Sequence, residues 1–219
     1  MNKINIDNIM YTDEIILLEN KSIRKIKVSG KCQIDIINSK VNELIIEADD
    51  NSSLLINYFN IINKQDSKID IKVKNKSSVI FNHSFKVLDK YNLDIKTDFL
   101  GKESSITVNL SGLNDGAKTI VDVKGYVKKN KNNNVLDENM RFININNGTV
   151  MSNPNMYIDT SLVIANHNTA IGGVSSNELF YLMSKGLSKE ESVKLICNGF
   201  LINKILSDEL RIKAKEVLN

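Results

Sequence analysis

The chain has 219 residues, and its 29 basic and 26 acidic side chains give a net charge of +3. One domain of this length buries about 70% of its unfolded surface, so it needs no disulfide or metal ion to fold. Three arginines are too few for a nucleic-acid surface, because guanidinium groups read phosphate and guanine. The longest apolar run, Leu179–Met183, is too short to span a membrane. We therefore expect a cytoplasmic protein with neither nucleic-acid nor membrane partners.

From the N-terminus to residue 174, short stretches alternate apolar and polar residues with a period of two, which is typical of β-strands. Polar clusters rich in Asn, Asp and Ser separate them, and no helix-length apolar stripe intervenes. The pattern predicts about a dozen strands. These stretches are residues 23–28, 32–37, 43–47, 54–59, 68–73, 79–87, 93–99, 106–110, 119–127, 142–146 and 156–158.

The composition predicts how the chain turns. There are 31 Asn but only 10 Gly and one Pro, and Asn is the non-glycine residue that best tolerates the left-handed region. We therefore expect Asn, Asp and Ser to make the turns. Asn-Gly hairpin signals are rare, so the pattern suits a coil-stacking solenoid as well as a sandwich. Periodicity alone leaves both open.

After residue 174 the periodicity becomes helical. An N-cap at Ser176 and a glycine at Gly186 bracket one predicted helix. Ser188 and Glu191 form a capping box that opens a second helix with a continuous apolar stripe. Ser207 caps a third. The sequence therefore predicts a β region over residues 1–174 and a helical segment over residues 175–219.

Four consecutive segments carry a family resemblance. They are Asn153–Asp159, Val163–Gly172, Glu178–Ser188 and Asn198–Leu201. In this order and spacing they resemble the C-terminal half of the SufB/SufD proteins of the SUF iron–sulfur cluster assembly system. The resemblance implies a right-handed parallel β-helix followed by helices that dock SufC, an ABC-type ATPase subunit. It also implies a short form without the N-terminal helical domain of many members. Because a solenoid end exposes strand edges, the helices are expected to cap it.

Within the family the chain is more similar to SufD than to SufB. In SufB a Glu follows the histidine that matches His167, whereas Asn168 stands here. Residues 135–158 contain no cysteine, so the sulfur-accepting thiolate chemistry of SufB is not expected. In SufD the matching histidine is a proposed ligand or assembly residue at the interface with SufB. The resemblance therefore implies a non-enzymatic scaffold subunit that pairs with a SufB-like chain or with itself.

Histidines and cysteines are the candidate ligands. An imidazole binds iron, so His167 is the candidate ligand for a transient iron or iron–sulfur cluster at a subunit interface, with no cofactor held by this chain alone. The alternative is a histidine hydrogen-bonded in a turn between strand and helix. His83 lies on an apolar face and is expected to be an interior histidine with satisfied hydrogen bonds. Cys32 and Cys197 are expected to be small buried hydrophobes.

Five apolar side chains on the helices are candidates for partner binding or, alternatively, for the core; they are Leu179, Phe180, Tyr181, Phe200 and Leu201. Two other functions remain open. One is a structural homodimer that has no cluster role. The other is a β-helix carbohydrate-active enzyme, which needs clustered carboxylates or bound calcium. The acids Asp94, Asp98 and Asp122 mark no such cluster.

Overall fold

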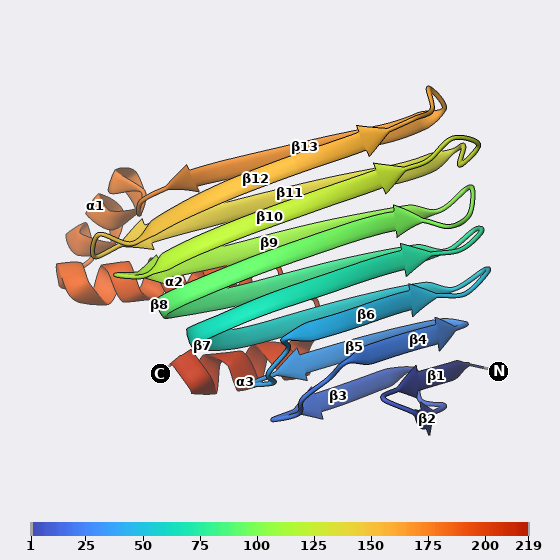
Figure 1. Cartoon of the computed structure of the whole chain (residues 1–219). Coiled ribbons are helices and arrows are strands. Elements are labelled where there is room, and N and C mark those ends of the chain that lie inside the picture. The colour runs from blue at the N-terminus through green and yellow to red at the C-terminus, as the bar shows by residue number, and fades with distance from the viewer. Residues whose placement is uncertain (1, 219) are drawn as a thin grey trace.

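The computed structural model describes residues 2–218 and confirms a mainly β fold, a parallel β-solenoid of about five turns followed by three helices (Figure 1). The strands are β1 (Lys3–Ile6), β2 (Ile9–Tyr11), β3 (Ile15–Glu19), β4 (Lys25–Ser29), β5 (Lys31–Ile37), β6 (Glu43–Ala48), β7 (Ser53–Val73), β8 (Ser78–Phe99), β9 (Ser105–Asp115), β10 (Lys118–Val127), β11 (Asn134–Ile145), β12 (Thr149–Ile158) and β13 (Val163–Gly172). The helices are α1 (Ser176–Ser184), α2 (Lys189–Ile202) and α3 (Asp208–Leu218). Among residues 2–218 no helix is long and apolar enough to cross a membrane.

Each coil of the solenoid contributes one strand to each of two faces, and β7 and β8 run through the corner between them. The helix-bearing face consists of β3, β5, residues 53–62, residues 78–87, β9, β11 and β13, all parallel. The far face consists of β4, β6, residues 64–73, residues 90–99, β10 and β12, also parallel. At the N-terminal end, β1 and β2 extend the far face in antiparallel fashion.

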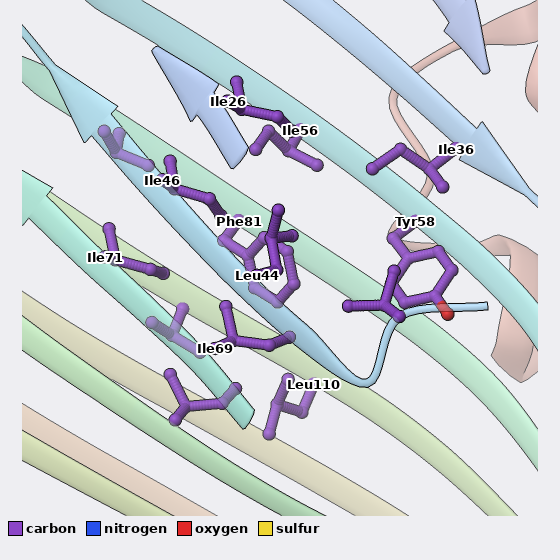
Figure 2. Close-up of a cluster of buried hydrophobic side chains, with 14 of the residues drawn as sticks. Ile26, Ile36, Leu44, Ile46, Ile56, Tyr58, Ile69, Ile71, Phe81 and Leu110 are labelled. Atoms are coloured by element: carbon purple, nitrogen blue, oxygen red, sulfur yellow. The ribbon is translucent and has the colours of Figure 1, made fainter. Parts of the chain in front are cut away.

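Side chains that alternate inward fill the lumen between the two faces. Ile34, Ile56, Phe81 and Val108 occupy one register position on four successive strands, and each is fully buried. In Figure 2, Ile56 and Phe81 point toward side chains of the far face such as Ile46. Burying one such side chain contributes about 1.5–3 kcal/mol. These stacked columns are the physical origin of the period-two pattern in the sequence.

The corners of the solenoid use Asn in the left-handed conformation, as the composition predicts. Eight of the eleven non-glycine residues with positive φ in the described chain are Asn. They are Asn8, Asn20, Asn38, Asn51, Asn130, Asn133, Asn146 and Asn147.

An amide ladder runs along the outer side of the helix-bearing face. Asn57 Nδ2 donates to Asp35 Oδ1 at 2.9 Å, Asn82 to Asn57 at 3.0 Å and Asn109 to Asn82 at 2.8 Å. The ladder continues through Asn139 at 3.2 Å and Asn168 at 3.1 Å. Its rungs are 22 to 30 residues apart, so successive coils stack in register although the sequence has no strict repeat.

The expectation that the helices cap the solenoid end is wrong. They pack on the outside of the helix-bearing face, where they form a second core with outward-facing apolar side chains of several coils; these are Ile37, Phe59, Leu113 and Ile143. Figure 1 shows α1 beside β13 and α3 beside β5 and β7. An ion pair between Lys213 and Glu19 (2.9 Å) joins α3 to β3. Because the outer side of this face is itself apolar, it attracts the helices and the end stays uncovered.

Candidate functional site

The C-terminal end of the solenoid is open. Within residues 2–218, β12 pairs only with β10 and β13 only with β11, so each has an unpaired edge. Several residues of β12 and β13 pair in register with luminal side chains of the preceding coil. These residues are half-buried or exposed. They include Val150, Met156, Val163, Ala165, His167 and Ile171. The last coil therefore presents its luminal side to the outside.

His167 lies within β13, not in the turn between strand and helix that the alternative interpretation required. Its partner in the ladder is Glu138 on β11, so both residues belong to the inward-facing set. The His167 side chain is exposed, and its imidazole makes no hydrogen bond within the described chain. The structure thus places the predicted candidate at the mouth of the lumen with both ring nitrogens available.

Sequence reasoning missed Glu138. It continues the luminal column formed by Ile34, Ile56, Phe81 and Val108, yet it carries a carboxylate. The side chain is fully buried, and neither carboxylate oxygen has a hydrogen-bond partner. Burial disfavours the charged form and raises the pKa of Glu138 to about 7.

The far face leaves room for this carboxylate. Gly125 on β10 lies across the lumen, and a Cβ on it would lie 3.0 Å from Glu138 Oε1 and 3.4 Å from Thr97 Oγ1. The Thr97 hydroxyl is likewise buried without a partner. A carboxylate and a hydroxyl therefore face the same glycine beneath the open end.

His83, in the middle of the solenoid, is the interior histidine that the sequence predicts. Its ring nitrogens lie 3.3 Å from Tyr58 O and 3.2 Å from Tyr91 Oη, and its ring stacks on Tyr58 with 4.2 Å between centroids. Burial lowers the pKa of His83 to about 3, which keeps the imidazole neutral. His83 is therefore a satisfied part of the core.

Cys32 and Cys197 are buried, as predicted, and burial raises the pKa of each thiol to about 11. Neither is a thiolate near neutral pH. Among residues 2–218 no group of three or more His, Cys, Asp or Glu side chains is placed to hold a metal ion.

A groove of about 620 Å³ lies between α1, α2 and the helix-bearing face. Tyr181 and Phe200 line it, and Phe200 lies under the Arg141 guanidinium at 5.5 Å. Phe180, on α1, is 75% exposed and Tyr181 is 60% exposed. Of the other two predicted partner residues, Leu179 is half-buried, whereas Leu201 is fully buried and packs in the second core. The structure thus exposes Phe180 and Tyr181, half-buries Leu179 and Phe200, and gives Leu201 a packing role; of the five, Tyr181 and Phe200 line the groove.

The chain matches the model of one known protein family. The model of the "SUF system FeS cluster assembly, SufBD core domain" matches residues 72–200. The chain belongs to this family. The match includes the last coils of the SufBD core, α1 and most of α2, and it therefore contains the open end and the groove.

Two curated SufBD relatives align with short parts of the chain. The iron–sulfur cluster assembly protein SufD of Bacillus subtilis (strain 168) is 44% identical over 50 residues, which is 23% of this chain and 11% of that protein. An iron–sulfur cluster assembly SufBD family protein of Pyrococcus horikoshii is 42% identical over 55 residues, 24% of this chain and 12% of that protein. The alignments thus span about an eighth or less of each relative's length. They confirm the resemblance to the SufB/SufD family.

Proposed function

We propose that this chain is a SufD-like, non-enzymatic scaffold subunit of iron–sulfur cluster assembly. In this role it pairs with a SufB-like chain across the open end of its solenoid and docks an ABC-type ATPase on its C-terminal helices. The observation that carries the proposal is the uncovered luminal side of the last coil in a chain of the SufBD family.

The open end has the properties of a subunit interface. The unpaired edges of β12 and β13 present free N–H and C=O groups, a template for pairing with another chain. Between them, apolar side chains such as Met156, Val163 and Ala165 are only partly buried against the core. A partner coil would bury them and complete the hydrogen bonds of the edge strands. His167 belongs to the same inward-facing set, which supports its role as the candidate ligand for transient iron or cluster cargo at this interface.

The helices offer a second interface of a different kind. Exposed aromatic residues beside an apolar groove are the usual anchors of protein–protein contacts. Tyr181 lines the groove with Phe200, and Phe180 is its exposed neighbour on α1. The sequence carries no Gly-rich phosphate-binding loop. Energy from ATP would therefore enter through a partner bound at this groove.

Co-purification of the tagged chain from its own cells, with identification of the bound proteins, tests the proposal. Ile171, at the mouth of the lumen, is 49% exposed, so Ile171→Lys should abolish recovery of a SufB-like chain without unfolding the coil. Phe180→Asp should abolish recovery of an ABC-type ATPase. Ile15→Lys is the matched control, because Ile15 is 61% exposed at the opposite end of the solenoid.

Three results are decisive. Separate loss of the two partners supports two interfaces and the scaffold role. Recovery of a second copy of the chain alone favours the structural homodimer. Partner recovery that is unchanged in both variants contradicts the proposal.

A further inference from the structure

A second groove, which we call the ladder groove, lies between the last rungs of the amide ladder and the C-terminal end of α2. Its volume is about 480 Å³. Among residues 2–218, no Asp or Glu lines it, so every ionisable side chain in its wall is basic. The lining residues that bear on its chemistry are Asn109, Ser111, Asn139, Arg141, Asn168 and Lys204.

The two cations of the ladder groove have no counter-charge. The Arg141 guanidinium lies 5.5 Å from the Phe200 ring, but it makes no ion pair or hydrogen bond within the described chain, and neither does the Lys204 ammonium. By contrast, the guanidinium of Arg211 is paired with Asp208 at 2.9 Å. A guanidinium has five N–H donors and no acceptor. The groove therefore has positive charge and unused donors available for a ligand.

Neutral donors in the same wall are also unused. Each side-chain amide nitrogen of Asn109, Asn139 and Asn168 has two protons, and the ladder uses one of them. The Ser111 side chain is only 3% exposed, yet its hydroxyl makes no hydrogen bond within the described chain. Buried polar groups in native proteins almost always have partners. An acceptor-rich ligand in the groove would supply one.

The end of α2 opposes an anion here, but only weakly. A helix C-terminus carries about half a negative charge. Two of the last carbonyls of α2 are already engaged, since Gly199 O accepts from Asn203 N at 3.1 Å and Ile202 O from Ile205 N at 3.2 Å. One cation is enough to offset the helix end, so the pair leaves an excess of about 1.5 positive charges.

We propose that the ladder groove binds the phosphate group of a small molecule. A phosphate has more acceptor oxygens than a carboxylate and so uses more of these donors, and the Arg141 fork fits two of its oxygens. The ladder groove shares Arg141, Phe200 and Asn203 with the groove that Tyr181 lines. The apolar part of a phosphate ester would therefore lie against the Phe200 ring. The inference goes beyond the proposed scaffold function and does not depend on it.

The test titrates the tagged chain, alone and in the complex recovered with its partners, with inorganic phosphate and with phenyl phosphate at low salt. ³¹P NMR measures binding, which should saturate with a Kd below about 1 mM. Arg141→Gln should weaken binding at least about tenfold, because hydrogen bonds between charged groups are strong. Lys204→Gln should weaken it by a smaller factor. The matched control is Arg24→Gln, which removes the same charge from an exposed arginine outside the groove and should leave binding unchanged.

The two probes distinguish the sources of the phosphate. Tighter binding of phenyl phosphate supports an ester whose apolar part reaches Phe200, and equal affinities support free phosphate. Lys204 is exposed, so its variant guards against misfolding.

Four results overturn the proposal. One is a lack of saturable binding of either probe to the wild-type chain, and another is an unchanged affinity in Lys204→Gln. Equal weakening in Arg141→Gln and Arg24→Gln means that the probes respond to net charge and not to a site. Binding that is present in the free chain and lost in the complex assigns the groove to an acidic side chain of the partner.

Discussion

Polar luminal side chains have opposite environments in the middle of the solenoid and at its end. In the middle, His83 is enclosed by aromatic neighbours and both ring nitrogens have partners. At the end, Glu138 and His167 share one column without a hydrogen bond to either side chain among residues 2–218. The partners of His83 come from the preceding coil and from its own coil, whereas the described coils supply none for Glu138 or His167.

The luminal side chains of the two regions also differ in what their burial stabilises. Luminal side chains of the middle coils are buried from both sides and stabilise the fold. Those of the last coil are covered from one side only, so their remaining apolar surface is available for association. We therefore expect mutations in the middle to change folding stability and mutations at the end to change binding.

The largest effect is expected in the middle of the lumen. Phe81→Ala empties a fully buried position and should lower the free energy of unfolding by about 3–5 kcal/mol. Met156→Ala, which truncates a partly buried luminal residue of the last coil, should lower it by less than about 1 kcal/mol in the isolated chain. Chemical denaturation of both variants measures the difference. Equal losses would contradict the division between the two regions.

The next largest effect depends on pH. His83 has a pKa of about 3 in the folded chain against 6.5 for a free histidine. Between these values the unfolded chain binds a proton that the folded chain does not, so stability falls as the pH is lowered from 6.5 toward 3. At pH 4.5 the loss is on the order of 3 kcal/mol relative to pH 7.

His83→Phe should remove the loss of stability in acid that comes from His83, while it keeps an aromatic ring against Tyr58. Thermal or denaturant unfolding of both proteins from pH 7 to pH 4 checks it. The variant should be somewhat less stable than wild type at pH 7, because Tyr91 loses a partner, and its stability should fall less steeply in acid. If the free energy of unfolding falls equally with pH in both proteins, protonation of His83 does not destabilise the folded chain, and the prediction is wrong.

A smaller effect separates an interior rung of the amide ladder from its last rung. Asn82 is buried and bonds to Asn57 on one side and Asn109 on the other. Asn82→Ala leaves those amides short of partners and should cost about 1–3 kcal/mol. Asn168 is the exposed last rung with one ladder bond, so Asn168→Ala should cost a few tenths of a kcal/mol. Urea unfolding resolves the two, and a costly Asn168→Ala would contradict the comparison.

Much of the fold follows from the sequence. Alternation located most strands but missed β1–β3 and β13, capping residues located the helices with the α1 N-cap at Ser175 and not at Ser176, and the Asn content predicted the left-handed corners. The parallel β-helix came from the resemblance and not from periodicity. The position of the helices was missed, although adjacent apolar pairs such as Ile36-Ile37 and Tyr58-Phe59 interrupt the alternation. Such pairs place one apolar residue in the lumen and the next on the outer side, which then needs a cover.

The candidate site was only half predictable, because it depends on register. The segment containing Asp137 and Glu138 offers two acids, and only the pairing with β9 and β13 shows that Glu138 faces the lumen. The ladder was hidden for the same reason, since its rungs are unevenly spaced in sequence. A pairwise alignment of successive coils would have revealed both.

The smallest effect on stability is expected at His167, and it is the sharpest test of the comparison because His83 is the same residue type. The His167 side chain is exposed and makes no hydrogen bond within the described chain, so His167→Asn should change the free energy of unfolding by no more than about 0.5 kcal/mol. His83→Asn, which puts an amide among stacked aromatic rings, should cost several times more. Denaturant unfolding of the isolated chain distinguishes them. If His167→Asn is as costly as His83→Asn, the imidazole at the mouth of the lumen holds the coil together and is not free to bind a ligand.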